Sequence, residues 1–316
     1  MAQAEDARRD EQRMRQIFTD LAMESGAANL RPEVRRMDGG VERTTVRITD
    51  EETARQTGRA MGRYITLSCP QSLTIDLTIR KTLARELAQA LKEMLPRKAA
   101  CVMVAGLGNR SVTPDALGPR TVERVLVTRH MKQCMPEDVG GRMRSVCAAA
   151  PGVLGVTGIE TAEMLRGMAQ HVKPDAVIAV DALAARSSTR ICSTIQIADT
   201  GIAPGSGVGN HRRPLDRQTL GVPVIAVGVP MVVYAATIAG DALSTFAQAD
   251  GANVKDEERL SQYVEQVVSE QLGELIVTPR EVDALVARMA GVVAEGINLA
   301  LHPSLSLNEI AQLMAQ

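Results

Sequence analysis

The sequence predicts a three-layer α/β fold, in which a mostly parallel sheet carries helices on both faces. Three short apolar runs support this prediction, at 101–105, 176–180 and 223–227. Runs made wholly of apolar residues are typical of strands buried on both faces of a parallel sheet. Helix-forming segments lie between the runs, and such alternation of strands and helices favours a parallel sheet covered on both sides.

The chain before residue 101 has a different pattern and predicts an added N-terminal β-hairpin region. Residues 34–50 alternate around Asp38-Gly39-Gly40, which indicates two short strands joined by a turn. A third extended run covers 63–69. Leucines spaced by four, at 83, 87, 91 and 95, then indicate one face of a helix.

Two sequence patterns predict where later helices begin. Thr157 with Glu160 forms a T-x-x-E capping box that would open a helix through His171. Thr278 with Glu281 forms another, opening a helix to about residue 299. A further helix is expected from about 118 to 131, after the first apolar run.

Composition excludes several classes of protein. The 316 residues include 36 Lys and Arg against 37 Asp and Glu, for a formal net charge of -1. This balance excludes a strongly basic nucleic-acid binder. With two Phe, three Tyr and no Trp, the core must use aliphatic residues and Met, and aromatic stacking platforms for single-stranded nucleic acid are not expected.

Cysteine usage predicts a reducing compartment. The five cysteines are scattered and form no C-x-x-C pair, which favours free thiols over disulfides or structural zinc. The N-terminus has no apolar signal-peptide core, and no uncharged run reaches the ~18 residues that would span a bilayer. We therefore expect a cytoplasmic protein that binds neither membrane nor nucleic acid directly.

Two aspartates mark a candidate site at the carboxyl ends of the predicted strands, where open α/β sheets bind ligands. Asp115 lies in the loop after the first apolar run, and Asp181 directly follows the second. Each also has a structural interpretation, as a turn residue or a helix N-cap. If the two side chains are adjacent they would share a proton, so that one acts as general base on a water while the other polarises a carbonyl.

Glycine-rich segments offer further candidates. The segment that begins at Gly106 has Ser111 where a dinucleotide fingerprint needs its third glycine, and 201–210 lacks the ending of a phosphate loop. The latter segment is either a surface loop or a mobile substrate-lining segment that includes Gly205 and Gly207. Gly155 and Gly158 precede a predicted helix, where backbone N–H groups would form an anion or oxyanion site unless these glycines serve only the turn geometry.

Long segments of the chain resemble the germination proteases of spore-forming bacteria, which degrade small acid-soluble spore proteins. The similar segments are GLGNRSVTPDALGPRTVERVLVTRH (106–130), APGVLGVTGIETAEML (150–165), PDAVIAVDALAARS (174–187), IQIADTGIAPGSGVGN (195–210), LGVPVIAVGVPMVV (220–233) and VTPREVDALV (277–286). The resemblance extends from about Thr19 to His302. It implies an aspartic-type endopeptidase whose two essential aspartates match Asp115 and Asp181, on a fold resembling hydrogenase maturation peptidases.

The resemblance also implies a zymogen that removes its own N-terminal segment. The matching position places the cut between Asp20 and Leu21, so 1–20 would be a propeptide and 21–316 a single α/β peptidase domain. It implies a homotetramer in the cytoplasm of the forespore or spore core. Arg186 is a candidate to bind an acidic substrate side chain next to the scissile bond, because the processing site itself presents Asp20 there.

Three alternatives remain open at this stage. No cofactor is predicted, but the related hydrogenase maturation peptidases bind a metal, so a metal-assisted peptidase using the same acidic site is one alternative. A non-catalytic α/β binding protein is the second. The third is a nucleotide hydrolase, which the incomplete glycine fingerprint disfavours.

Overall fold

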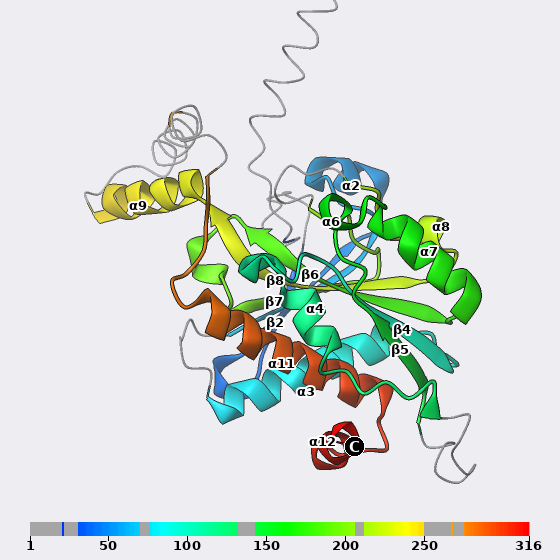
Figure 1. The fold of residues 1–316 in the computed structure, drawn as a ribbon. Helices are drawn as coiled ribbons and strands as arrows, with labels where there is room; N and C mark the ends of the chain where they lie inside the picture. The colour runs from blue at the N-terminus through cyan, green and yellow to red at the C-terminus, as the bar shows by residue number, and fades with distance from the viewer. Residues whose placement is uncertain are drawn as a thin grey trace, which may run out of the picture.

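A nine-stranded sheet forms the middle layer of the computed structural model (Figure 1). The structure describes residues 21, 31–69, 76–131, 143–205, 212–249, 267 and 275–315. The strands lie in the order β1-β2-β3-β7-β8-β6-β4-β5, and β9 pairs with β8 outside this path. Helices cover both faces, so the three-layer α/β prediction is confirmed.

The parallel part of the sheet contains all three apolar runs. They form β4 (Cys101–Gly106), β6 (Ala176–Ala185) and β8 (Val224–Tyr234), and β5 (Ser145–Ala149) adds an edge strand that the sequence analysis did not identify. The pairs β5–β4, β4–β6 and β6–β8 are parallel. This arrangement brings the carboxyl ends of β4, β6 and β8 to one edge of the sheet.

The remaining strands are antiparallel. The predicted hairpin is confirmed as β1 (Glu33–Arg36), the 3₁₀ turn η2 (Asp38–Gly40) and β2 (Glu42–Ile48), and the third extended run is β3 (Gly62–Ser68). β7 (Thr194–Ala198) pairs with both β3 and β8, and β9 (Ile276–Val277) pairs with β8. β7 therefore joins the hairpin region to the parallel strands in one sheet.

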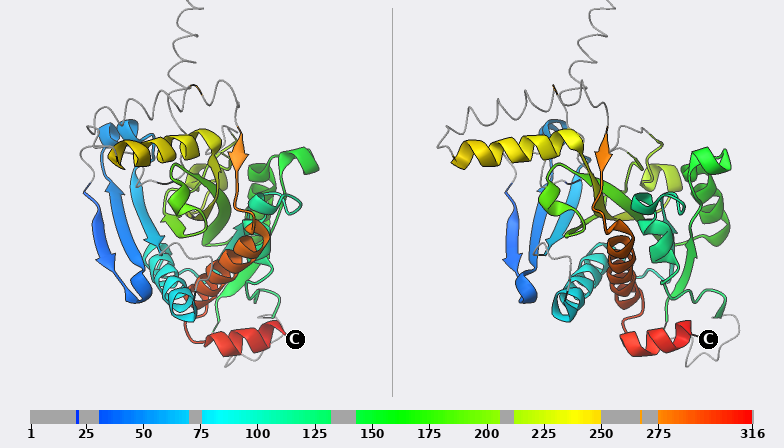
Figure 2. Two further views of the ribbon diagram at one scale, coloured as in Figure 1. Left: turned by 90° about the vertical axis from the view of Figure 1, so that its left-hand side faces the viewer. Right: turned by 60° about the vertical axis from the view of Figure 1, so that its left-hand side comes forward.

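Two groups of helices cover the faces of the sheet, as the further views show (Figure 2). One face carries α3 (Leu77–Met94), α4 (Leu117–Val122) and α11 (Val282–Leu301), with α12 (Leu307–Met314) packed on α11. The other carries α2 (Glu51–Thr57), α6 (Leu154–Thr157), α7 (Thr161–Val172) and α8 (Arg217–Leu220). After β8 comes α9 (Ala235–Ala249), which projects from the body at the left of Figure 1.

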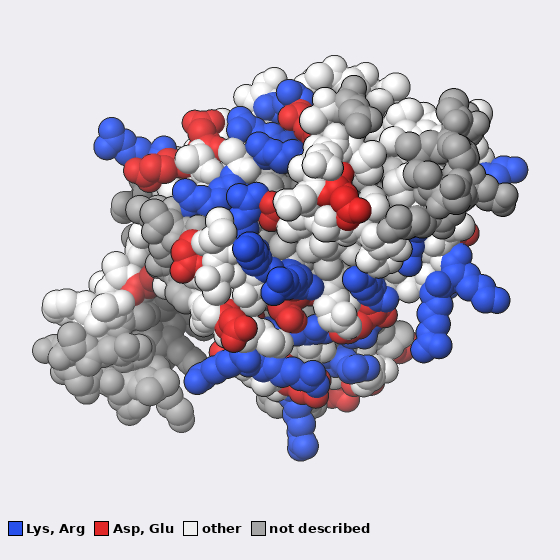
Figure 3. All heavy atoms as spheres, turned by 90° about the horizontal axis from the view of Figure 1, so that it is seen from below, with Lys and Arg blue, Asp and Glu red and all other residues white. Residues whose placement is uncertain are grey.

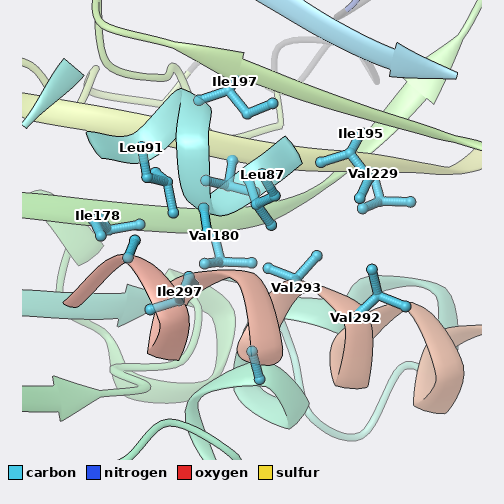
Figure 4. Close-up of a cluster of buried hydrophobic side chains, with 14 of the residues drawn as sticks. Leu87, Leu91, Ile178, Val180, Ile195, Ile197, Val229, Val292, Val293 and Ile297 are labelled. Carbon is cyan, nitrogen blue, oxygen red and sulfur yellow. The ribbon is translucent and has the colours of Figure 1, made fainter. Parts of the chain in front are cut away.

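Alternate side chains of β6 pack into two different hydrophobic clusters, one on each face of the sheet. Ile178 and Val180 point into the larger core, where they meet aliphatic side chains of α3 and α11 (Figure 4). Val177 and Ala179 point the other way and pack in the cluster that includes Leu165 of α7. Because alternate residues of a strand share a face, the odd-numbered residues that follow, including Asp181, lie on the side of α7.

Three predicted helix boundaries are wrong. α7 begins at Thr161 after Glu160, whose side chain makes no cap, and the Thr157 hydroxyl donates to the Val153 carbonyl instead. α11 begins at Val282, and the Thr278 hydroxyl donates to Met231 O. Neither capping box forms, because neither threonine is an N-cap: Thr157 is the last residue of α6, and Glu160 and Glu281 precede α7 and α11. The helix expected over 118–131 is shorter than predicted, because α4 ends at Val122.

The outer surface of the α3 and α12 side interleaves both signs of charge (Figure 3). Arg43 pairs with Glu93 at 2.7 Å, and Arg80 pairs with Glu295 between α3 and α11. Of the described helices, α11 alone is long and apolar enough to cross a membrane, but 67% of its most apolar window is buried inside the fold. It serves here as a core helix against α3 and α4.

Candidate active site

The loop after β4 holds Asp115 by its backbone and its carboxylate. Asp115 ends the 3₁₀ turn η3 (Thr113–Asp115), and its Oδ2 accepts a hydrogen bond from the Asn109 N–H at 2.6 Å. Gly108 has φ +106°, and a Cβ there would clash with the Asp115 carbonyl. A glycine is therefore required for this loop to close on Asp115.

Asp181 lies within β6 and not at its end, which corrects the expected strand boundary. β6 continues to Ala185, because β8 pairs with it through Val233. The pairing with β4, however, stops where Gly106 meets Val180, and the Leu107 N–H then donates to Val180 O at 2.8 Å. Asp181 is thus the first residue of β6 beyond the end of β4. Its side chain is buried, and Oδ1 accepts from the Ala182 N–H at 2.9 Å.

The packing of η3 brings the two aspartate-bearing segments to the same edge of the sheet. η3 lies against β6 and β8, and α4 follows it after one residue. Gly118 of α4 rests directly on backbone atoms of Leu107 and Val180. The loop that carries Asp115 is therefore anchored to the strand residue that precedes Asp181.

The environment of Asp115 favours its neutral form. Burial raises the pKa of this carboxyl, and the Asn109 N–H and the positive charge of Arg212 oppose that rise without cancelling it. Arg212 has a buried Nη1 that finds no hydrogen-bond partner among the described residues. Arg212 was not among the predicted site residues, although it belongs to the basic run His211-Arg212-Arg213, which directly follows the glycine-rich segment 201–210 and favours a substrate-lining role for that segment.

The glycine-rich segment is anchored at its base by backbone hydrogen bonds. Ile202 and Leu215 exchange two backbone hydrogen bonds, of 3.0 and 2.7 Å. Gly205 adopts φ +73° in a turn within the segment. Gly207 lies outside the described residues. The two backbone hydrogen bonds fix Leu215, three residues after Arg212, beside Ile202.

The remaining candidate residues occupy different positions. Arg186 follows β6 directly and is exposed, so it extends from the end of a strand. Gly158 ends α6 with φ +71°, and its N–H donates to Leu154 O at 2.8 Å, which commits that N–H to the helix end. Gly155 lies inside this four-residue helix. Asp20 falls outside the described residues, whereas Leu21 is described and fully buried.

The acidic edge provides few ligands for a metal ion. Catalytic zinc sites use three protein ligands as a rule. Over the described ranges, no group of three or more His, Cys, Asp and Glu side chains is placed to hold a metal. Asp115 and Asp181 supply two carboxylates, so these residues do not match such a ligand set, and the mechanism below uses the carboxylates alone.

The raised pKa of Asp115 leads to a prediction about stability. Unfolded, an aspartate titrates near its ordinary value of 3.8. Because the folded pKa is higher, the stability that Asp115 contributes is complete below pH 3.8 and is lost as pH rises through the folded pKa. The side chain in Asp115→Asn cannot ionise. We therefore expect the difference between the Tm of this variant and the Tm of the wild type to increase in favour of the variant as pH rises from about 3 to 7.

Asp50 offers a control of opposite sign. It caps α2, and the hydrogen bond from the Thr53 N–H, at 2.8 Å, lowers its pKa. Its contribution to stability is therefore present above its unfolded pKa and lost as pH falls. The Tm of Asp50→Asn should therefore decrease relative to the Tm of the wild type as pH rises. Parallel pH profiles of Tm for the two variants would contradict the assignment of Asp115 as a buried carboxyl with a raised pKa.

The fold and this edge define an α/β protein with two acidic residues where its parallel strands end. Comparison with known proteins gives the family: the germination protease model matches residues 11–270 and 252–313. The chain belongs to the germination protease family, and it is therefore a peptidase.

Curated relatives agree with this assignment. The germination protease of Clostridium acetobutylicum is 48% identical over 221 residues, covering 66% of this chain and 68% of the relative. That of Bacillus subtilis is 44% identical over 254 residues, covering 67% and 69%. Among solved structures, a [NiFe] hydrogenase maturation protease, HycI from Thermococcus kodakarensis KOD1, aligns with a TM-score of 0.33 and 19% identity over 66% of this chain and 98% of that chain.

Proposed function

We propose that this peptidase is an aspartic-type endopeptidase that begins the degradation of small acid-soluble spore proteins during germination. One observation carries the proposal: η3, which bears Asp115, packs against β6, and Asp181 is the first residue of β6 beyond its pairing with β4. Two acidic side chains of different environment at one strand edge suit general acid–base hydrolysis of a peptide bond.

The environments suggest how the two carboxyls divide the work. Asp115, whose pKa burial raises, is the group that stays protonated and donates a hydrogen bond to the substrate carbonyl oxygen. Asp181 then takes a proton from the water that attacks the carbonyl carbon. The proton on Asp115 compensates the charge that develops on the carbonyl oxygen, and the leaving amine later receives the proton held by Asp181.

We further propose that the chain is made as a zymogen, works as a homotetramer in the cytoplasm of the forespore or spore core, and needs no cofactor. Residues 1–20 would be removed by cleavage between Asp20 and Leu21, leaving 21–316 as the peptidase domain. Arg186 is proposed to bind the acidic side chain before the cut. This position is compatible with its exposed place directly after β6, the strand that carries Asp181.

Self-processing provides the direct test. Purified full-length protein incubated at mildly acidic pH should acquire a new N-terminus at Leu21, read by N-terminal sequencing, and should then digest a small acid-soluble spore protein. The same incubation with a chelator should give the same rate. An N-terminus that stays at residue 1, with no digestion of the substrate, would refute the proposal, and loss of processing with the chelator would favour the metal-assisted alternative.

A further inference from the structure

A small apolar cluster lies next to Asp181 on the same face of the sheet. Leu183 and Ala185 follow Asp181 at alternate positions of β6, so their side chains share its face. Both are buried, and they pack with Leu21, whose side chain is 0% exposed. Ile202, at the base of the glycine-rich segment, packs against the same cluster.

The Leu183 side chain packs over Gly228, the residue of β8 that pairs with Asp181. Gly228 of β8 is the Cα partner of Asp181, and a Cβ on Gly228 would clash with the Leu183 side chain. Leu183 therefore fills the space above Gly228, beside Asp181. Residues two apart in a strand are separated by about 7 Å on the same face, so one bound chain can contact both Asp181 and Leu183.

Leu21 is the residue that follows the proposed cut. Its burial against Leu183 and Ala185 places the side chain after the scissile bond beside one of the two proposed catalytic groups. The members of the cluster are all aliphatic, so the cluster favours an apolar side chain and excludes a charged one, which would be desolvated without a partner.

We propose that Leu183, Ala185 and Ile202 form the pocket for the substrate side chain after the scissile bond, and that Leu21 occupies this pocket in the uncut chain. The proposal rests on the proposed function, specifically on Asp181 as a catalytic group and on cleavage before Leu21. It adds the residues that determine specificity: Ala185 leaves room for a leucine, and a larger residue there would fill the pocket.

Two peptides that differ only in the residue after the cut, Leu or Ala, test this proposal through the ratio of their kcat/KM values. Hydrophobic pockets discriminate by about 10–200-fold per methylene group, so the wild type should prefer Leu by at least tenfold. Ala185→Leu should reduce that preference at least tenfold. Ile202→Ala opens the pocket instead of filling it, and it should reduce the preference for Leu severalfold. This variant tests the proposal if Ala185→Leu does not fold.

Leu91→Ala is the matched control, because Leu91 is equally buried but lies in α3 on the opposite face of the sheet, in a cluster that does not include Ile202. It should leave the ratio unchanged. Full-length Leu21→Ala should also process itself more slowly, by the factor that separates the two peptides. An unchanged ratio in folded Ala185→Leu and Ile202→Ala, with normal cleavage by the wild type, overturns the pocket alone. A wild type that cleaves neither peptide overturns the proposed function and this proposal with it.

Discussion

Asp181→Asn is expected to lower kcat/KM for a spore-protein substrate by about 10²–10⁴-fold, the usual contribution of a general acid or base. Asparagine keeps the shape of the side chain and an oxygen to accept the Ala182 N–H, but it cannot take a proton from water. Asp115→Asn should lose activity to a similar extent, because the amide is a weaker donor than a carboxylic acid toward the carbonyl oxygen. Steady-state cleavage kinetics and circular dichroism of both variants would measure this.

Asp175→Asn provides a control at the opposite end of the same strand. Asp175 precedes β6, and its Oδ2 accepts from the N–H groups of Ala100 and Cys101 at 2.7 and 2.8 Å. Its role is to hold the start of β4, so its replacement should lower stability and leave kcat/KM close to the wild-type value. Equal losses of activity in Asp175→Asn and Asp181→Asn would mean that the strand is only a scaffold and that the chemistry lies elsewhere.

The sequence predicts three of the four parallel strands, β4, β6 and β8, because these strands are buried on both faces and nearly every residue in them is apolar. The fourth, β5, is an edge strand that is only partly buried, and it was not predicted. β7 has no such signal: Thr194 and Gln196 alternate with Ile195 and Ile197, and its place in the sheet comes from pairing with β3 and β8. The end of β6 was missed for a related reason. Residues 182–185 favour a helix by composition, but the pairing with β8 keeps them extended, since tertiary context overrides local preference.

The candidate site likewise contains residues that the local sequence predicts and residues that only the fold brings close. Asp181 was predicted as a site residue because a carboxylate after five apolar residues is unusual in a strand, and Asp115 because it lies in the loop after the neighbouring strand. Arg212 and Leu21 reach the site through tertiary contacts, with Asp115 in one case and with Leu183 and Ala185 in the other. No local spacing encodes such contacts, so they become visible only when the fold brings distant segments together.

Gly118→Ala is expected to be the most damaging small substitution near the site. An added Cβ would lie 2.6 Å from Val180 O and would clash with the backbone of Leu107. These are backbone atoms of β6 and of the residue after β4, so they cannot rotate away as a flexible side chain would. We expect a loss of stability of about 1–3 kcal/mol or more, measured by urea unfolding, together with a large loss of activity.

Gly167→Ala is the matched control for this prediction. Gly167 lies inside α7, and a Cβ there would meet nothing within 4 Å. The same change should therefore stabilise the helix by roughly 0.5–1 kcal/mol and leave cleavage unaffected.

The loss of activity in Gly118→Ala should exceed what its lower stability explains. α4 follows η3 after a single residue, so moving Gly118 away from Val180 also moves Asp115 relative to Asp181. At a temperature where the variant is fully folded, kcat should still fall, because misplacing a catalytic group by about 1 Å can cost ~100-fold. A folded Gly118→Ala enzyme with wild-type kcat would show that the position of Asp115 does not depend on this contact.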